Sequence, residues 1–500
     1  MSEPRRVRLT IDGRTVEADA GTNVLKASES AGIDIPHFCY HPGLEIEGSC
    51  RMCLVEIEGL PKLELSCSTL VREGLVVRTS TERVRSARKD VLEFLLAEHP
   101  LDCPICDKAG ECLLQDDYDR HGRYASRSIE TRERREKKLP IGRRLILDRE
   151  RCVLCSRCVR FLRQVTRTGE LGVFERAVRS EVGLVEDRPV DNNYSGNLVD
   201  ICPVGAITAE DFRFRTRAWF LTRKPTVCPH CGRGCAVFIE SVSGYPLKRS
   251  DSRVYRVTAR ENPAVNGHWI CDLGRDGRHD IDDGRTAGLA GKGRELPGWT
   301  WPAALARVGE AIRALPAPDR RARLAVVLNS RMTCEELALA KSLFVRGLGL
   351  DRIYFADAKP GAGDRLLLTP ERVPNARGVL EAGFDPRLPG LHELAASKVA
   401  LIFGTGLAAH FPEEALAEVL AEIPEKHIFS SHATPLDRLA DTVIPTAVPA
   451  EKSGTYINVE GLRQTFAQAL RPCPGVVTEG DILSGLADRL AIDAGRDDAR

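Results

Sequence analysis

Residues 152–158 read CVLCSRC and residues 195–208 read SGNLVDICPVGAIT, and these two segments decide the fold of the middle of the chain. Seventeen cysteines occur among the 500 residues, and fifteen of them lie between Cys39 and Cys271. In a reducing cytosol, thiols grouped in this way indicate metal ligands before they indicate disulfides. The spacing of these residues defines four candidate ligand sets.

The third set is the most informative one and consists of Cys152, Cys155, Cys158 and Cys202. Its spacing is similar to the closing half of a bacterial two-cluster ferredoxin, in which each C-x2-C-x2-C run is completed by the fourth cysteine of the other run. The remaining positions of such a module are occupied here by Leu162, Asn192, Ser195 and Leu198. We therefore expect a two-cluster fold that keeps one 4Fe-4S cluster.

The first set lies nearer the N-terminus and consists of Cys39, Cys50, Cys53 and Cys67, spaced C-x10-C-x2-C-x13-C. Four thiolates on a loop beside a small sheet can hold a 2Fe-2S cluster, although the first spacing is longer than the x4 of plant-type ferredoxins. A zinc site is the alternative, but zinc ligands usually come as two close pairs. The single cysteine ahead of the pair favours the cluster.

The second set combines a histidine with three cysteines: His99, Cys103, Cys106 and Cys112. Three thiolates leave one position of a cubane-type 4Fe-4S cluster open, and we expect the His99 imidazole, on the last turn of a preceding helix, to fill it. A neutral imidazole makes the cluster less negative, which tends to raise its reduction potential. A lone histidine at a helix end can instead contact the helix dipole or a carbonyl, but the three neighbouring cysteines favour the ligand role.

The fourth set consists of Cys228, Cys231, Cys235 and Cys271, spaced C-x2-C-x3-C-x35-C. It fits either another 4Fe-4S cluster or a zinc ribbon. Gly232 and Gly234 favour the cluster, because we expect their backbone N–H groups to approach the sulfurs. The remaining thiols, Cys334 and Cys473, have no close thiol neighbours and are interpreted as buried apolar residues without a role.

Local patterns place the first two sets on secondary structure. Alternating apolar residues on both sides of Asp12-Gly13 predict a hairpin. A helix capped by Thr22 or Asn23 should then run to Gly32 and lie across the sheet. A second helix should run from Thr81 until Pro100 stops it. The charged stretch 120–151 is typical of a linker or a solvated surface.

The part of the chain beyond Trp299 has a different pattern. Residues 324–328 and 399–403 are short apolar runs followed by helical patterns, as in parallel α/β layers. Gly404, Gly406 and Ala409 form G-x-G-x-x-A, the outline of a dinucleotide fingerprint that a tight strand-to-helix turn explains equally well. Neither a G-x-x-x-x-G-K-[ST] loop nor an H-E-x-x-H motif follows Cys271.

Composition describes a soluble, multidomain globular protein. The chain has 43% hydrophobic residues, and 72 basic against 71 acidic side chains leave a net charge of +1. Such a balance provides no large field to gather nucleic acid, and we expect no nucleic-acid partner. We find no signal peptide, no lipidation signal and no apolar run long enough to span a membrane, so membrane association is expected only through partner subunits.

In this order and spacing, the four sets resemble those of the large iron–sulfur subunit (the G subunit of bacteria) of NADH:quinone oxidoreductase, respiratory complex I. The segments that carry the resemblance are HPLDCPICDKAGECLLQD (99–116), SGNLVDICPVGAIT (195–208), CPHCGRGC (228–235) and EKSGTYINVEG (451–461). The remainder resembles a shortened molybdopterin-oxidoreductase domain through NSRMTCEELALAKSL (329–343) and PNARG (374–378). Catalytic molybdenum relatives place a Cys, selenocysteine or Ser metal ligand where residues 351–375 offer neither Cys nor Ser, so no molybdopterin is expected.

The fold class implied by the resemblance is an α+β and α/β multidomain protein. Its domains would be a β-grasp 2Fe-2S ferredoxin domain (1–79), a 4Fe-4S domain with one histidine and three cysteine ligands and a charged linker (80–146), a two-cluster-ferredoxin-like 4Fe-4S domain (147–218), a 4Fe-4S domain of molybdopterin-oxidoreductase type (219–284) and a truncated molybdopterin-oxidoreductase-like α/β domain (285–490). The polar residues 491–500 are expected to form a frayed tail.

The function implied by the resemblance is electron transfer through one 2Fe-2S and three 4Fe-4S clusters, without a catalytic residue on this chain. Electrons would enter from a partner subunit that binds NADH and FMN and leave through ferredoxin-like and quinone-site subunits towards quinone, coupled to ion translocation. The fourth cluster would lie off this path. The chain would sit peripherally on the cytoplasmic side of the cell membrane, as part of a membrane complex.

Two alternatives remain open at this point. One is the equivalent subunit of a soluble NAD-linked hydrogenase or formate dehydrogenase, because these enzymes share the N-terminal cluster modules. The other is a molybdenum-dependent catalytic subunit that oxidises formate.

Overall fold

The computed structural model describes residues 5–129, 131–242, 253–286, 288–295, 298 and 300–493. The chain divides into two compact units, Met1–Leu221 and Thr222–Arg500. Most of the predicted tail, residues 494–500, lies outside the described residues.

The first unit begins with a five-stranded sheet in the order β2-β1-β5-β3-β4. Its strands are β1 (Arg6–Ile11), β2 (Arg14–Asp19), β3 (Leu54–Ile57), β4 (Glu64–Leu65) and β5 (Val76–Arg78). The predicted hairpin is confirmed, because β1 and β2 pair antiparallel around Asp12-Gly13. Helix α1 (Val24–Ser30) is capped by the Asn23 side chain, and its Val24 and Leu25 share one apolar core with the sheet. This sheet and helix frame the first ligand set.

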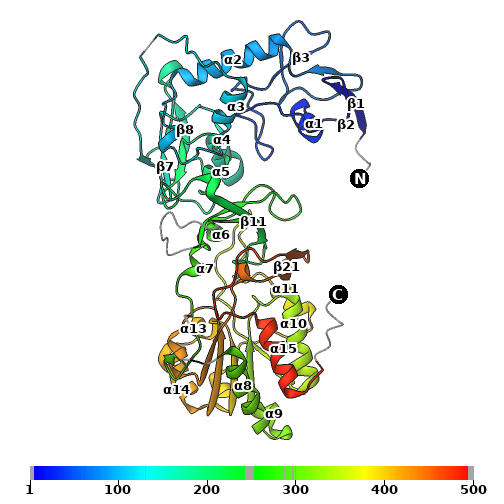
Figure 1. Cartoon of the computed structure of the whole chain (residues 1–500), viewed down its shortest axis with the longest axis vertical. Coiled ribbons are helices and arrows are strands. Elements are labelled where there is room, and N and C mark those ends of the chain that lie inside the picture. Colours follow the sequence, from blue (N-terminus) through cyan, green and yellow to red (C-terminus); the bar gives the residue numbers. More distant parts are fainter. Residues whose placement is uncertain are drawn as a thin grey trace. The chain divides into compact units, whose positions relative to one another are not determined.

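Helix α2 (Glu82–Ala97) connects this sheet to the second ligand set (Figure 1). The predicted start is confirmed, since the Thr81 hydroxyl accepts a hydrogen bond of 3.3 Å from the Val84 amide. The helix ends at Ala97, so His99 follows the helix and does not lie on its last turn as predicted. Proline cannot continue a helix and disfavours helical geometry in the residue before it, which explains the early end ahead of Pro100.

The rest of the first unit consists of short elements around the cysteines. They are a 3-10 turn (Cys103–Ile105), α3 (Leu113–His121), α4 (Arg157–Phe161), a π turn (Leu162–Thr166), a 3-10 turn (Ala177–Arg179), α5 (Asn197–Ile201), the hairpin of β8 (Leu171–Phe174) and β9 (Glu181–Leu184), a 3-10 turn (Ala218–Phe220), and a sheet of β6 (Leu139–Pro140), β7 (Leu145–Leu147) and β10 (Ile207–Ala209). The prediction that 120–151 forms a linker or a solvated surface is wrong at its end. Strand β7 is buried throughout, and buried Arg151 pairs with buried Asp148 at 3.2 Å.

The second unit begins with a small sheet that carries the fourth ligand set. Strands β11 (Leu221–Val227), β12 (Ala236–Val242) and β13 (Val254–Ala259) lie in the order β11-β12-β13. Helices α6 (Asp272–Asp276) and α7 (His279–Asp282) follow.

A seven-stranded sheet in the order β15-β14-β20-β19-β18-β16-β17 forms the main body of the second unit. Its strands are β14 (Ala290–Gly291), β15 (Arg294–Glu295), β16 (Leu324–Leu328), β17 (Tyr354–Phe355), β18 (Val399–Phe403), β19 (Glu425–Ser430) and β20 (Thr442–Pro445). The five strands from β20 to β17 are mutually parallel. The prediction of parallel α/β layers over 324–328 and 399–403 is therefore confirmed, with every residue of both strands buried.

Helices cover both faces of this sheet (Figure 1). Helices α8 (Trp301–Ala314), α10 (Cys334–Ala340) and α15 (Glu479–Leu490) share an apolar core with one face, and α12 (Leu391–Ala395) and α14 (Glu413–Glu422) with the other. The remaining elements are α9 (Ala317–Arg323), a π turn (Lys341–Gly347), α11 (Ala376–Glu381), α13 (Gly406–His410), 3-10 turns (Pro435–Leu439 and Pro449–Glu451) and the hairpin of β21 (Gly454–Ile457) and β22 (Arg463–Phe466).

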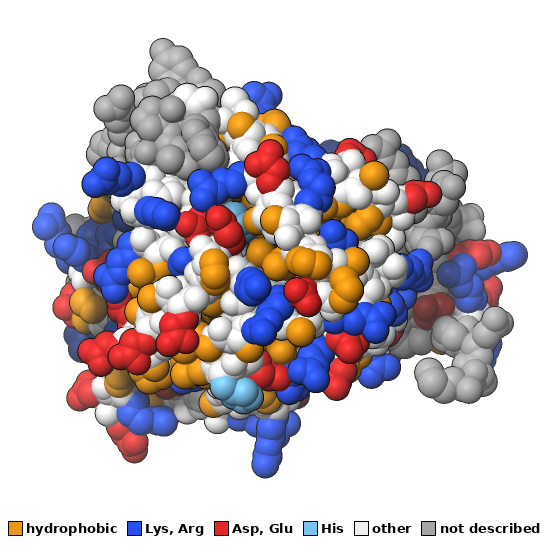
Figure 2. All heavy atoms as spheres, turned by 90° about the horizontal axis from the view of Figure 1, so that it is seen from below, with side chains coloured by type: hydrophobic (Ala, Val, Ile, Leu, Met, Phe, Trp, Pro, Cys, Tyr) orange, Lys and Arg blue, Asp and Glu red, His pale blue; other side chains and the backbone are white. Residues whose placement is uncertain are grey.

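On the face shown in Figure 2, basic and acidic side chains are interspersed, with hydrophobic side chains between them. This intermingling fits the near balance of 72 basic and 71 acidic side chains. Within the described part of the chain, none of the helices combines the length and apolarity required to cross a bilayer.

Candidate metal centres

The first set lies on the loops beside the five-stranded sheet. Its cysteines form two contacting pairs, Cys39 with Cys50 and Cys53 with Cys67, and only Cys50 is not fully buried. The hydrogen bond within each pair lowers the pKa of Cys39 and of Cys53 and raises the pKa of their partners Cys50 and Cys67. The Phe38 amide points at the Cys50 sulfur at 3.5 Å. Such N–H···S contacts are typical of iron–sulfur sites and tune their reduction potential.

The second set combines buried and exposed ligands. Cys106 and Cys112 are buried and Cys103 is exposed, and burial raises the pKa of Cys112 to about 11. The His99 imidazole is neutral, because burial lowers its pKa to about 4. Within the described chain its buried Nδ1 has no hydrogen-bond partner. A neutral imidazole whose Nδ1 has no hydrogen-bond partner fits the role of a metal ligand. It fits less well the alternative, a contact with the helix dipole or a carbonyl.

The third set surrounds a cavity of its own. All four of its cysteines line this cavity, together with apolar side chains such as Leu147, Val182 and Val204. Burial raises the pKa of Cys152 to about 12 and that of Cys155 to about 11, so these thiols hold their protons. Metal binding must displace these protons, which makes loading of the site dependent on pH.

The missing half of the two-cluster module is filled by side chains. Leu162 and Leu198 are 0% exposed and Ser195 is 1% exposed, while Asn192 is half-buried. Close packing at these positions fits the expectation of one cluster in this module.

The fourth set lies around the start of the three-stranded sheet. Cys228 follows β11, Cys235 precedes β12, Cys271 caps α6, and all four cysteines are buried. The Cys228 amide donates to the Cys235 carbonyl at 2.8 Å, which closes the loop. Burial raises the pKa of Cys271 to about 11.

The prediction that Gly232 and Gly234 direct their N–H groups at sulfurs is not confirmed. Their amides donate to the carbonyls of Glu371 and Cys231. Gly232 is required because a Cβ there would lie 2.5 Å from Val459 Cγ1, and Gly234 because its φ is +62°. The glycine that does approach the sulfurs is Gly274, whose Cβ would lie 3.1 Å from the Cys228 sulfur.

Each set contains a left-handed residue in the loop between its cysteines. These residues are Arg51, Gly110, Leu154, Ser156 and Gly234, with φ between 51° and 87°. Alternation of right- and left-handed residues turns successive amides inward to form an anion-binding nest, as in many iron–sulfur sites. The Leu154 amide, 3.4 Å from the Cys152 sulfur, is one such contact.

Gly205 belongs to the third set's segment but makes room for the second set. A Cβ on Gly205 would lie 2.1 Å from the Cys106 sulfur. The Leu113 amide also donates to the Pro203 carbonyl at 3.0 Å. The segment after Cys202 therefore forms part of the wall around the second set, which ligand spacing alone could not predict.

Among the residues that the structure describes, no three His, Cys, Asp or Glu side chains converge tightly enough to hold a single metal ion.

The thiols outside the sets differ from expectation, because Cys334 and Cys473 are half-exposed and not buried. Cys334 contacts the Asn375 side chain at 3.7 Å.

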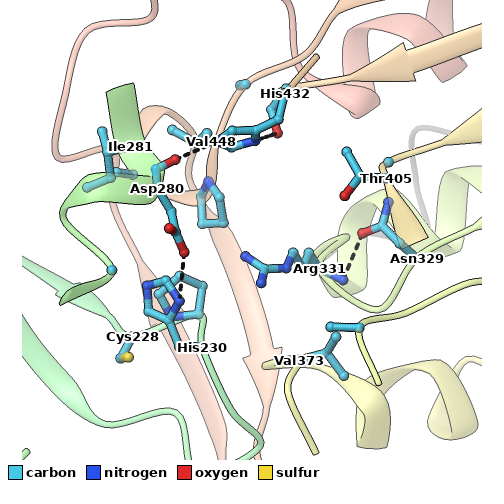
Figure 3. Close-up of a pocket in the computed structure, with 18 of the residues that line it drawn as sticks. Cys228, His230, Asp280, Ile281, Asn329, Arg331, Val373, Thr405, His432 and Val448 are labelled. Carbon is cyan, nitrogen blue, oxygen red and sulfur yellow. Dashed lines mark hydrogen bonds and ion pairs between the residues drawn. The ribbon is translucent and has the colours of Figure 1, made fainter. Parts of the chain in front are cut away.

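A cavity of about 330 Å³ lies beside the fourth set, at the carboxyl ends of β16, β17, β18, β19 and β20 (Figure 3). In Figure 3, Arg331 points into the cavity and His230 lies against Asp280. The His230 Nδ1 and Asp280 Oδ2 atoms are 3.6 Å apart. Burial, reinforced by Arg331, lowers the pKa of His230 to about 3, so this imidazole is neutral. The lining contains the basic Arg331 and the acidic Asp280 and Asp357. Its charge therefore favours neither an anionic nor a cationic ligand.

The glycines of the G-x-G-x-x-A segment also line this cavity. Gly404 has a φ of +87°, and a Cβ on Gly406 would lie 1.8 Å from the Ala356 carbonyl oxygen. The tight turn alone explains both glycines, and the helix that follows, α13, is only five residues long.

Three family models match the first unit. Residues 4–82 match a 2Fe-2S iron-sulfur cluster binding domain, and residues 88–127 match the NADH-ubiquinone oxidoreductase-G iron-sulfur binding region. Residues 142–208 match the ferredoxin-like domain of NADH-quinone oxidoreductase subunit 3. Domains that bind 2Fe-2S and 4Fe-4S clusters are therefore present.

Similar proteins are named as the G subunit of NADH-quinone oxidoreductase or as its mitochondrial counterpart. The G subunit of Streptomyces coelicolor is 35% identical over 97% of this chain and 58% of that protein. The G subunit of Mycobacterium bovis is 38% identical over 77% of this chain and 49% of that protein. The 78 kDa subunit of Candida albicans NADH-ubiquinone oxidoreductase is 36% identical over 69% of this chain and 47% of that protein. The chain thus spans about half the length of these relatives.

A solved structure titled as an NAD+-reducing [NiFe]-hydrogenase in the H2-reduced state matches with 33% identity and a TM-score of 0.38. The match covers 42% of this chain and 90% of that one.

Proposed function

We propose that this chain is an electron-transfer subunit of an NADH-quinone oxidoreductase. The premise is its homology to the G subunit of that enzyme. The observation that carries the proposal is the match of residues 4–82, 88–127 and 142–208 to iron–sulfur and ferredoxin-like family models, because these stretches contain the first three predicted ligand sets. Iron–sulfur clusters supply one-electron transfer when bound. The chain's own residues hold them apart and exclude water from them.

The ligand assignment follows the four sets. Cys39, Cys50, Cys53 and Cys67 would hold a 2Fe-2S cluster. A 4Fe-4S cluster would be held by His99, Cys103, Cys106 and Cys112, another by Cys152, Cys155, Cys158 and Cys202, and a third by Cys228, Cys231, Cys235 and Cys271. No molybdopterin is part of this proposal. The parallel sheet would correspond to the truncated molybdopterin-oxidoreductase-like domain and serve as a scaffold.

The partners in this proposal are a flavin subunit that binds NADH and FMN, and ferredoxin-like subunits that lead to the quinone site. The chain would lie peripherally on the cytoplasmic side of a membrane complex.

Metal and sulfide analysis of the anaerobically purified full chain tests the proposal. One 2Fe-2S and three 4Fe-4S clusters predict fourteen irons, matching acid-labile sulfide and two classes of electron-resonance signal. Zinc without labile sulfide would refute the cluster assignment. Molybdenum at one atom per chain would support the formate-oxidising alternative, and nickel in the co-purified complex would support the hydrogenase alternative.

A further inference from the structure

Helix α4 buries two guanidinium groups between the first and third ligand sets. Arg157 is 6% exposed and Arg160 is 2% exposed. A guanidinium keeps its charge at any ordinary pH, so both positive charges are held away from water. The helix also contains Cys158 and directly follows Cys155 and Ser156, which fixes it to the third set.

Both side chains reach across to the loop that begins at Cys39. Arg160 donates to the backbone carbonyls of Cys39 and Glu45, and Arg157 donates to the carbonyl of Tyr40. On the other side, Arg160 donates to the Cys155 carbonyl at 3.3 Å and Arg157 to the Ile201 carbonyl at 3.1 Å. Each guanidinium is therefore hydrogen-bonded to the backbone at or beside a ligand of both sets.

The charge of these two groups is poorly compensated by carboxylates. Within the described part of the chain, Arg157 has no carboxylate at ion-pair distance, and the Arg160 Nε atom lies 3.8 Å from Glu47, which is 40% exposed. A buried cation without a partner costs several kcal/mol in general. Anionic ligands on both sides supply the missing partner.

We propose that Arg157 and Arg160 are positioning residues shared by the 2Fe-2S centre and the third-set 4Fe-4S centre. The two arginines fix the separation of these centres and raise the reduction potential of each. This inference rests on the proposed function, since it needs both centres. The physical reason is that a reduced cluster carries one more negative charge than an oxidised one. A nearby cation at low dielectric favours the reduced form.

Redox titration of the full-length, cluster-loaded chain, followed by electron resonance, tests this inference. The variants are Arg157→Gln and Arg157→Lys, and the third-set signal is identified by its loss in Cys152→Ala. We expect Arg157→Gln to shift the reduction equilibrium of both centres about tenfold towards the oxidised form, or about 59 mV for a one-electron couple. Arg157→Lys should keep most of the potential, because the charge remains.

A matched control comes from Arg217, which also donates to backbone carbonyls but at the second set. It bonds to the carbonyls of Cys106, at 2.7 Å, and Pro104. Arg217→Gln should leave the 2Fe-2S and third-set potentials unchanged.

The Arg160→Gln and Arg160→Lys pair repeats the comparison at the second guanidinium. If Arg157→Gln does not assemble both centres, Arg160→Gln decides, with Arg160→Lys as its charge-conserving control. Unchanged potentials in an Arg→Gln variant that contains both centres would overturn the inference but not the proposed function. A shift confined to one centre would show that the guanidinium is not shared, and would also overturn it. Absence of the 2Fe-2S signal from the unsubstituted chain would instead refute the proposed function.

Discussion

Both regions that carry most of the fold bury charged side chains, but beside the parallel sheet the buried Lys452 is paired with Glu336 at 2.7 Å and with Glu479 at 3.0 Å. In β16 and β18 every residue is apolar and buried, and helices add apolar side chains on both faces. Between residues 99 and 221, the buried side chains include Asp107, Asp148, Arg151, Arg157 and Arg160. Apolar burial stabilises by about 25 cal/mol per Å², whereas buried charge destabilises unless it is compensated.

This difference teaches where each region obtains its stability. The parallel sheet folds on its own apolar contacts. With the proposed ligands, the region around the second and third sets would depend on bound clusters, because most of its thiols are buried or half-buried and two guanidinium groups contact the backbone beside them. Metal binding is part of the folding free energy in such small modules.

Removal of iron should therefore destabilise the region around the second and third sets and leave the parallel sheet folded. We expect this to be the largest of the effects. Chelation of the full chain under anaerobic conditions should abolish amide protection over residues 99–221, with a loss on the order of 10 kcal/mol, as for structural metal sites. Strands β16, β18 and β19 should stay protected. Hydrogen exchange with mass spectrometry measures both regions at once.

A matched control uses a thiol outside the four sets. Cys334→Ala should leave the iron content and the exchange pattern unchanged. Equal loss of protection in the sheet after chelation would mean that the two regions are not independent sources of stability.

Substitution of His99 should affect a single cluster. His99→Ala removes the ligand with the orphaned Nδ1 atom and should alter or abolish one 4Fe-4S electron-resonance signal, while the 2Fe-2S signal remains. His99→Cys is the matched variant, because it restores a fourth ligand but adds negative charge, and should lower the potential of that cluster. An unchanged spectrum in His99→Ala would exclude His99 as a ligand.

The elements with a strong local pattern could be predicted from the sequence. The hairpin at Asp12-Gly13, the helix beginning at Thr81 and the runs 324–328 and 399–403 all form as expected. Each depends on side-chain periodicity or a cap within a few residues, which the sequence displays directly. The ligand assignments remain predictions, supported by the burial and grouping of the sets.

The features that sequence analysis missed depend on contacts between distant segments. Gly205 makes room for Cys106, and Gly274 makes room for Cys228, although neither lies between the cysteines it serves. Arg157 and Arg160 stand within or beside C-x2-C-x2-C, and they bond to a loop more than 100 residues away, which no local pattern displays. The close approach that requires Gly232 was missed for the same reason, because Val459 comes from the far end of the chain.

Truncation of a core aromatic residue should affect only the apolar region. Phe403 is 1% exposed and stacks on Phe429 with ring centroids 4.4 Å apart. Phe403→Ala should destabilise the sheet by about 3–5 kcal/mol through lost burial and the resulting cavity. Denaturant unfolding followed by exchange in β16 measures this, with Leu380→Ala, at a site 53% exposed, as a control expected to change stability by less than about 0.5 kcal/mol. Loss of cluster signals in Phe403→Ala would contradict the separation of the regions.

Acid should weaken the sheet through His427, which is 0% exposed in β19. Burial lowers the pKa of His427 to about 4, below the ordinary value of about 6.5. As the pH falls from 6.5 to 4, the unfolded chain binds a proton that the folded chain refuses, so stability falls by at most about 3 kcal/mol. His427→Gln should reduce this pH dependence in urea unfolding of the sheet, whereas His392→Gln, at an exposed position, should keep it. Parallel curves for His427→Gln and the unsubstituted chain would show that acid acts on this region through other groups.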